Sequence, residues 1–273
     1  NVTVRDSGGD GIGASQAVGD WRIADSTVIS TTYEGVNADG ATGEWVIEDT
    51  VVVDAGRSGI RSVNANGAWS VRNVTVRNAG DAGIDAGFTT SDWVVRDATL
   101  VKNDIGVSAV ETSGDWLVTD SRIRDNTGDG ISLSLGDQGV DPVSGNWTVT
   151  ESVIANNGGA GLDARNVVST GNATRNWWGA PDGPSGNFTG SGDEVTGDLS
   201  NVTVRPYYID NELATLSSGS STTVRVGSAG TGVNGTATVP IVLSNASAGV
   251  SGYNVTVTVA DGSVATISNA SGG

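Results

Sequence analysis

Cysteine, histidine and methionine are absent from the 273-residue sequence. Without cysteine there is no disulfide, no thiol nucleophile and no thiolate metal site. Without histidine there is no Ser-His-Asp triad, no imidazole general base and no imidazole ligand for zinc or copper. The sequence therefore excludes the catalytic and metal sites that depend on these residue types.

Lysine is almost absent too. Lys102 stands alone beside 13 arginines, aspartate outnumbers glutamate 24 to 7, and the net charge is −17. This charge argues against nucleic acid as a partner, because phosphate binding needs clustered cations. Hyperthermophile surfaces are rich in Lys and Glu, and this one avoids both. It resembles haloarchaeal proteins, whose acidic side chains hold water and salt ions. An ordinary acidic secreted protein is the alternative.

The sequence has no recognisable signal peptide, and no apolar run approaches the ~20 residues that a membrane span needs. The repeat described next is already under way at residue 1. We therefore expect a piece of a longer protein, with no membrane span in this fragment. The glycosylation motifs described below lead us to expect that it is extracellular or at the cell surface.

Tryptophan marks an internal repeat. Six tryptophans follow one another at intervals of 24, 24, 24, 23 and 31 residues, namely Trp21, Trp45, Trp69, Trp93, Trp116 and Trp147. Aliphatic residues recur two, seven and about fifteen positions after each Trp. Each repeat thus contains three short alternating stretches, which is the pattern of strands. Three strands in a repeat of this length indicate one turn of a solenoid.

The alternation also predicts which columns face the interior. Trp has the same parity as the aliphatic residue two positions later, so both are expected inside. The small residue five positions after Trp is expected inside where the cross-section is narrow. The glycine before the third aliphatic column, such as Gly35 or Gly59, is expected to supply backbone angles that other residues resist. A strip of Trp faces open to sugar rings is the alternative for the Trp column.

The repeat and the segment after it resemble a known superfamily. Asn176-Trp177-Trp178-Gly179, followed by Gly183-Pro184, resembles the NWWG…GP segment that often follows the last regular turns of NosD-like repeats. These are also described as carbohydrate-binding and sugar-hydrolase domains. The resemblance implies a right-handed parallel β-helix, here of about seven turns. It implies no single activity, because the superfamily holds pectinases, lyases, adhesins and structural proteins.

The expected fold is all-β, with the parallel β-helix over residues 1–209 and the NWWG segment closing it. Residues 210–222 are polar and serine-rich and are predicted to be a linker. Residues 223–273 alternate again and resemble the opening strands of a cohesin-like β-sandwich, as found on archaeal surface proteins. A sandwich needs ~100 residues, so we expect only part of one here.

Two carboxylate columns are candidates for catalysis, one immediately before Trp and one four positions after it. Their repetition in every turn favours corner and solvation roles, whereas a catalytic pair would be a local departure from the repeat. An outward column three positions after Trp adds arginines, although Glu48 beside Arg72 is more simply a surface ion pair. The catalytic candidates are Asp92, Asp97, Asp115, Asp120, Arg72 and Arg96.

The interval between Trp116 and Trp147 contains about seven extra residues. Function concentrates on loops held by a rigid scaffold. Asp137, Gln138 and Asp141 offer oxygen ligands of the kind that calcium takes, although no EF-hand spacing is present. They are the candidate ligand- or ion-binding residues, with a tolerated insertion as the alternative. The sequence predicts no cofactor, with calcium as the alternative.

Asn-x-Ser/Thr occurs ten times, more often than the composition predicts. The excess predicts an exported glycoprotein, although strands rich in Asn-Val-Thr explain part of it. The candidate glycosylation sites are Asn1, Asn73, Asn146, Asn172, Asn187, Asn201, Asn234, Asn245, Asn254 and Asn269.

Uniform repetition without a chemically distinct cluster favours a non-catalytic surface or extracellular protein, either a structural stalk or a glycan-contacting, adhesive module. One alternative is a polysaccharide lyase or glycoside hydrolase acting on an acidic polysaccharide. Another is a subunit of an extracellular homopolymer, which would self-associate through outward Ile29, Val53 and Val101. The copper delivery that the NosD resemblance suggests is disfavoured by the missing His, Cys and Met. The expected partners are a polysaccharide or surface glycan, or a second copy.

Overall fold

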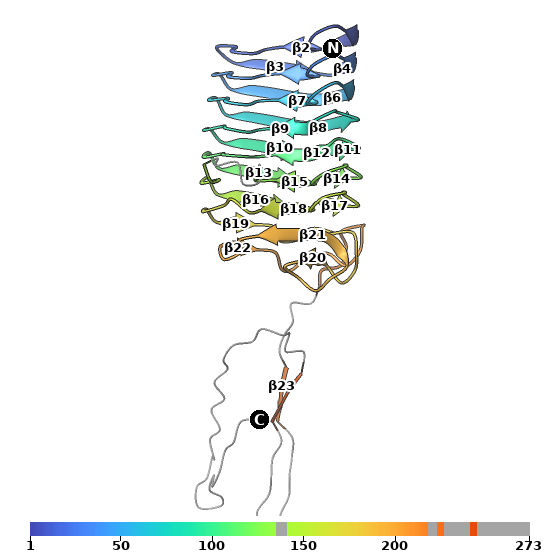
Figure 1. Ribbon diagram of the computed structural model, residues 1–273, viewed down its shortest axis with the longest axis vertical. Coiled ribbons are helices and arrows are strands. Elements are labelled where there is room, and N and C mark those ends of the chain that lie inside the picture. Colours follow the sequence, from blue (N-terminus) through green and yellow to red (C-terminus); the bar gives the residue numbers. More distant parts are fainter. Residues whose placement is uncertain (135–140, 218–222, 227–240, 245–273) are drawn as a thin grey trace, which may run out of the picture. The chain divides into compact units, whose positions relative to one another are not determined.

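The computed structural model describes residues 1–134, 141–217, 223–226 and 241–244. The chain divides into two compact units, Asn1–Ser217 and Ser218–Gly273. The first unit is a stack of short strands joined by turns (Figure 1). Among the described residues no helix is long and apolar enough to cross a membrane.

Each Trp of the repeat begins a strand of a 13-stranded sheet, here called the long sheet. Its Trp strands and their two successors are β3 (Trp21–Ala24), β6 (Trp45–Ala55), β8 (Trp69–Arg77), β10 (Trp93–Arg96), β13 (Trp116–Thr119), β16 (Trp147–Thr150), β19 (Gly171–Asn172) and β22 (Val202–Thr203). A second strand follows in most turns, as β1 (Thr3–Ser7), β4 (Thr27–Thr31), β11 (Thr99–Val101), β14 (Arg122–Arg124) and β17 (Val153–Ala155). The second halves of β6 and β8 take this place in their own turns.

The third stretch of each repeat forms a separate nine-stranded sheet. In spatial order its strands are β2 (Ile12–Gly13), β5 (Val36–Asn37), β7 (Ile60–Arg61), β9 (Ala82–Asp85), β12 (Ile105–Ser108), β15 (Ile131–Ser132), β18 (Leu162–Ala164), β21 (Gly192–Gly197) and β20 (Pro184–Gly186). Neighbouring strands of both sheets run parallel. The all-β parallel β-helix expected from the repeat is therefore confirmed, with about 7 turns.

The second unit contributes two described strands. β23 (Thr223–Val226) and β24 (Ile241–Ser244) pair antiparallel, with Thr223 opposite Ser244 and Val226 opposite Ile241. The rest of the expected partial sandwich lies outside the described residues.

The strands stack in the register that the repeat predicts. Trp21 pairs with Trp45, and each later Trp pairs with the next along the chain. The three aliphatic columns become the core. Their members in the turn that begins at Trp45 are Ile47, Val52 and Ile60, all fully buried. The small column is buried as well, from Ser26 at 3% exposure to Ser152 at 0%.

The tryptophans form one continuous stack inside the solenoid. Successive ring centroids from Trp21 to Trp147 lie 4.7–5.5 Å apart with interplanar angles of 2–14°. Gly171 ends the stack, because a Cβ there would lie 2.1 Å from Cζ2 of Trp147. The indole N–H groups find no acceptor among the described residues. Ring contact and burial therefore stabilise the Trp column, and its indole N–H groups contribute no hydrogen bonds.

Each turn bends at residues in the left-handed backbone conformation. The column four positions after Trp has φ near +50° in every turn, as in Asp49, Asn73 and Asp97. Asn and Asp tolerate this conformation better than other residues with a Cβ, because their short polar side chains bond locally. The corner role expected for this column is confirmed.

The glycine before the third column has a different role from the one expected. Gly35 and Gly59 do not have positive φ values. A Cβ on Gly35 would lie 2.3 Å from Cγ1 of Val52 and 2.5 Å from the carbonyl oxygen of Gly59. The expectation of special backbone angles was therefore wrong, and the glycine is required because the next turn leaves no room for a side chain.

Two polar ladders run through the interior beside the apolar columns. Asn103 donates to Asn126 Oδ1 at 3.2 Å, Asn126 donates to Asn157 Oδ1 at 2.9 Å, and Asn157 donates to Asp193 Oδ2 at 2.8 Å. In the small column, the Ser121 backbone N–H donates to Ser152 Oγ at 3.1 Å. These ladders satisfy buried backbone groups at the corners, as a packed interior requires.

The NWWG segment closes the solenoid. The side chain of Asn176 is fully buried and donates to the carbonyl oxygens of Val149 and Ala173. Residues beyond 209 also pack on this end, since the backbone N–H of Ser217 donates to the Tyr207 carbonyl at 2.6 Å. The compact unit therefore extends to Ser217, eight residues into the segment that the sequence suggested as a linker.

Candidate functional site

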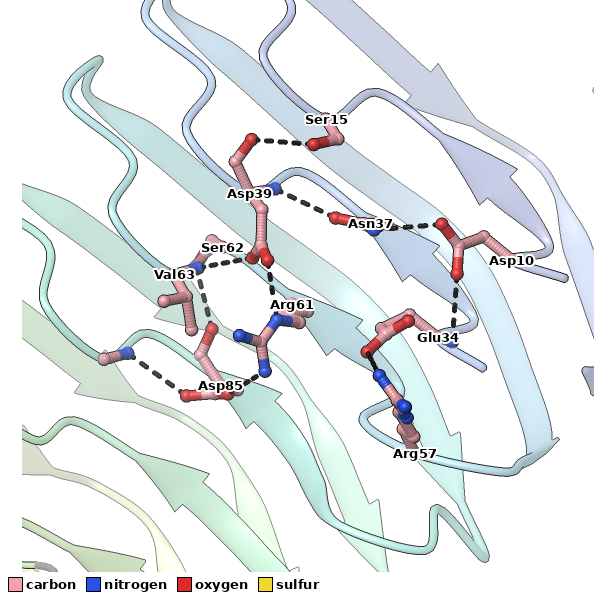
Figure 2. Close-up of polar contacts among 11 residues, drawn as sticks. Asp10, Ser15, Glu34, Asn37, Asp39, Arg57, Arg61, Ser62, Val63 and Asp85 are labelled. Carbon is pink, nitrogen blue, oxygen red and sulfur yellow. Dashed lines mark hydrogen bonds and ion pairs between the residues drawn. The ribbon is translucent and has the colours of Figure 1, made fainter. Parts of the chain in front are cut away.

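The outer face of the nine-stranded sheet carries a cluster of charged side chains near its N-terminal end (Figure 2). Alternation creates it, because Val36, Ile60 and Ile84 point into the core and the residue after each points outward. We call it the carboxylate–arginine cluster, and its members are Asp10, Glu34, Asn37, Asp39, Arg57, Arg61 and Asp85. Register places Asn37, Arg61 and Asp85 side by side in successive turns.

Arg61 lies between two aspartates. Its Nε donates to Asp39 Oδ2 at 2.7 Å, and its Nη1 donates to Asp85 Oδ2 at 3.2 Å. Backbone N–H groups hold the same carboxylates, Val63 donating to Asp39 and Gly87 to Asp85. Burial raises the pKa of Asp85, while the Gly87 N–H and Arg61 oppose that rise. Figure 2 shows the guanidinium bridging the two turns.

Glu34 is the most buried acid of the cluster, with 5% of its side chain exposed. Asp10 accepts hydrogen bonds from the Glu34 backbone N–H at 3.3 Å and from Asn37 Nδ2 at 2.9 Å. Burial raises the pKa of Glu34, and the neighbouring Asp10 carboxyl raises it further. Arg57 opposes the shift from 3.8 Å away, where its guanidinium also lies over the Tyr33 ring. Glu34 therefore retains its proton to a higher pH than an exposed glutamate does.

A second group of acids lies farther along the same sheet. Asp163 is 1% exposed, and Arg165 Nε donates to both of its carboxylate oxygens at 2.9 and 3.0 Å. Burial raises the pKa of nearby Asp129, although the Ala160 N–H donates to its Oδ1 at 2.8 Å. Raised carboxyl pKa values thus recur along this sheet, which is one mark of a functional site and also of an ion-pair network.

The aspartates predicted as catalytic lie on the other sheet and are not brought together as one group. Asp92 and Asp115 are neighbours at the start of the Trp strands, while Asp97 and Asp120 are neighbours at the far end. Five residues of extended chain separate Asp92 from Asp97, about 16 Å. All four are exposed. They form two adjacent pairs at opposite corners, without a shared centre.

The predicted arginines are neighbours. Arg72 lies opposite Arg96 in the pairing of β8 with β10, and both are exposed. Glu48 is the register neighbour of Arg72 in the turn before, and its Oε2 lies 3.1 Å from Arg72 Nε. Arg22 contacts the same carboxylate. The surface ion pair expected between Glu48 and Arg72 is therefore present.

The insertion can be followed only in part. Asp137 and Gln138 lie outside the described residues. Asp141 is exposed, and its backbone carbonyl accepts a hydrogen bond from Asn166 Nδ2 at 3.2 Å. In the described ranges no three acidic side chains gather as a metal site. A calcium site at the insertion stays a prediction.

Comparison with known proteins agrees with the stacked geometry. Residues 10–177 match the family model described as the right-handed beta helix region. The chain belongs to this family. The right-handed parallel β-helix that the resemblance implied is thereby confirmed. No curated protein matches the chain by sequence.

One solved structure similar to this β-helix is the crystal structure of pectate lyase Pel9A. It shares 14% sequence identity and a TM-score of 0.46, over 80% of this chain and 73% of the lyase chain. A similarity at this level does not extend to activity.

A shallow groove of about 580 Å³ crosses the first three Trp strands of the β-helix. Its lining alternates charged and small residues with Trp21, Trp45 and Trp69. Trp45 and Trp69 each have a stacked ring on both faces, whereas Trp21 is stacked on Trp45 alone. A sugar ring would need an open aromatic face to stack on, and Trp45 and Trp69 offer none.

Sequence reasoning missed the carboxylate–arginine cluster and the buried ladder of the β-helix. The ladder has a signal, because asparagine stands ten positions after Trp93, Trp116 and Trp147. The cluster leaves almost no signal in the sequence, because the residue at its outward position changes from turn to turn, as Asn37, Arg61, Asp85 and Ser108. Contacts such as Arg61 with Asp39 run diagonally between turns, and the repeat pattern does not show them.

Proposed function

We propose that the chain is a non-catalytic β-helix module that serves as a structural stalk of an exported, extracellular or cell-surface protein. One observation carries this proposal. Asp20, Asp92 and Asp115 each accept a hydrogen bond of 2.9–3.0 Å from the backbone N–H of the residue before Trp in the next turn. Carboxylates bound in this way link adjacent turns, which is a structural use of the column.

Export is supported by the asparagines of the glycosylation motif. Six of them fall in the described ranges and all six are exposed, namely Asn1, Asn73, Asn146, Asn172, Asn187 and Asn201. The other four, Asn234, Asn245, Asn254 and Asn269, lie outside the described residues. A glycan attached at an exposed corner adds no steric conflict with the stacked core. Mass spectrometry of the chain from its native source tests occupancy at each position.

A second candidate function is cleavage of an acidic polysaccharide at the carboxylate–arginine cluster. Burial raises the pKa of Glu34, the direction that suits a general acid, and Arg61 offers a cation for a sugar carboxylate. Against this, Arg61 is already bound by Asp39 and Asp85. A substrate would have to compete with two intramolecular carboxylates, so the structural role comes first.

An activity screen separates the two functions. The folded chain, verified by circular dichroism in molar salt, is incubated with calcium and a panel of acidic and neutral polysaccharides. New reducing ends and the absorbance of unsaturated products are read. We expect no turnover. Turnover lost in Glu34→Gln would overturn the stalk proposal and favour the cluster. Turnover lost in Asp115→Asn would overturn it too and favour the corner columns.

A further inference from the structure

The long sheet carries a concentration of positive charge within a protein of net charge −17. Six of the 14 lysines and arginines lie on or beside three successive turns of this sheet, and all six are exposed. We call them the basic stripe, and they are Arg72 and Arg77 of β8, Arg96 of β10, Lys102 directly after β11, and Arg122 and Arg124 of β14.

The stripe differs from the rest of the solenoid in how its charges are balanced. Elsewhere in the described β-helix, Arg5 and Arg205 have no ion pair, whereas five arginines have a carboxylate partner, namely Arg22, Arg57, Arg61, Arg165 and Arg175. Within the stripe, Arg72 pairs with Glu48 at 3.1 Å and Arg124 with Asp125 at 2.6 Å. The other four stripe cations form no ion pair with any described residue, and they are Arg77, Arg96, Lys102 and Arg122.

Register places these cations in line along the solenoid axis. Arg72 is opposite Arg96, and Val101 is opposite both Arg77 and Arg124 in the turns on either side. Turns of a parallel sheet are about 4.8 Å apart, so charged groups recur at one or two turn spacings. Like charges in directly opposite positions destabilise a sheet, so folding alone does not account for the pair.

The corner between the two halves of the stripe holds the closest acids. Asp97 and Asp120 occupy it, and Asp125 lies at the end of β14. Glu48, which binds Arg72 from the turn before, is a fourth neighbouring acid. Six cations against these four carboxylates leave an excess of two positive charges (6 − 4 = 2). Half-exposed threonines such as Thr75 and Thr99 lie between the arginines and add hydroxyl groups to the surface.

We propose that the basic stripe binds an acidic polysaccharide that carries one carboxylate on each sugar. Arginine suits this partner, because its guanidinium can donate two parallel hydrogen bonds to a carboxylate. Single charges on successive sugars match cations that recur at one turn spacing, as Arg72 and Arg96 do, or at two, as Arg77 and Arg124 do. DNA has one charge per ~1.7 Å, far denser than the stripe. This binding goes beyond the stalk function, because a stalk requires no ligand.

Binding to polygalacturonate tests the proposal. The full chain is titrated with polygalacturonate and with neutral dextran of matched length, at the lowest salt concentration where it stays folded. We expect binding to polygalacturonate alone. The variant Arg77→Gln/Arg96→Gln/Arg122→Gln should bind at least tenfold more weakly and should show a shallower dependence on salt, because fewer charges are neutralised.

A matched control separates the stripe from net charge. Arg5→Gln/Arg22→Gln/Arg205→Gln removes the same charge from exposed positions outside the stripe and should bind within twofold of wild type. The gain variant Thr99→Lys, which adds a cation between stripe residues, should bind more tightly. Equal losses in both triple variants would overturn the proposal. Equal binding of dextran, or binding of single-stranded DNA in place of polygalacturonate, would overturn it too.

Discussion

The two outer faces of the solenoid use arginine in opposite ways. On the nine-stranded sheet, Arg61 is bound by Asp39 and Asp85 from the turns before and after. On the long sheet, Arg96 has Arg72 as its register neighbour and no ion pair among the described residues. The same stacking of turns thus joins opposite charges on one face and aligns like charges on the other. Stacking fixes which positions meet, and the residue in the neighbouring turn decides whether the meeting stabilises the fold.

The Trp column supports both faces, so its removal has the largest expected effect. Trp93 is 1% exposed and stacks on Trp69 and Trp116. Trp93→Ala would leave a cavity and lower the free energy of unfolding by about 3–5 kcal/mol. Denaturant unfolding measures this. Val94→Ala, which changes the outward neighbour on the same strand, is the control. A loss below about 1 kcal/mol for Trp93→Ala would contradict the stack as the main support.

The buried ladder comes second. Asn126 Oδ1 accepts the backbone N–H of Asn103 at 3.0 Å, so Asn126→Ala would leave a buried donor without a partner. We expect a loss of about 1–3 kcal/mol in the free energy of unfolding. Thr127→Ala, at the next position, removes an exposed hydrogen bond to Asp104 of the preceding turn and should change stability by no more than about 0.5 kcal/mol. Equal effects in the two variants would show that the ladder contributes no more than a surface contact.

A matched pair of variants tests the contrast between Arg61 on one face and Arg96 on the other. Arg61→Gln would leave Asp39 and Asp85 without their shared cation and should cost about 1–3 kcal/mol of stability. Arg96→Gln removes an unpaired, exposed cation and should change stability by no more than about 0.5 kcal/mol. Thermal and urea unfolding of both variants measure the difference. A larger loss for Arg96→Gln would reverse the contrast between the faces.

The smallest effect expected is a change in pH dependence at Glu34. Its pKa is raised in the folded chain by burial and by Asp10. The native state therefore holds a proton that the unfolded chain has released. The stabilisation is complete below the ordinary value near 4.5 and is lost as pH rises through the folded pKa.

Glu34→Gln mimics the protonated acid, so its stability should fall less than that of wild type as pH rises from 4.5 to neutrality. Urea unfolding at a series of pH values measures the slope. The exposed Glu44→Gln serves as control and should keep the wild-type slope. An unchanged slope in Glu34→Gln would mean that Glu34 is ionised throughout this range.

Much of the fold could be predicted because each turn repeats the same pattern of inward and outward residues. Trp spacing and alternation predicted the strands and the inward columns, and the repeated Asp/Asn column predicted the corners at residues such as Asp49. The glycine column shows the limit. Gly35 was correctly placed before a strand, but its reason was missed, because the crowding comes from Val52 seventeen residues later. Close approach between turns depends on how the turns stack, so neighbouring positions in the sequence do not reveal it.

The candidate site was harder to predict for the same physical reason. Aspartates in repeated columns, such as Asp92 and Asp115, were candidates because carboxylates recur at these positions. In the structure they recur because each accepts a backbone hydrogen bond from the next turn. The acids with raised pKa, such as Glu34 and Asp85, occur in columns whose residue changes from one turn to the next. Burial sets their pKa values, and burial of an outward side chain depends on its neighbours in other turns.

The sequence by itself determined the period of the solenoid, the residues that face its core and the positions of its corners. These follow from side-chain alternation and backbone preference, which act within a few residues. The tertiary structure alone decided that Arg61 joins two aspartates while Arg96 meets another arginine. Such contacts connect side chains 22 to 24 residues apart, and they form only when successive turns stack about 4.8 Å from each other.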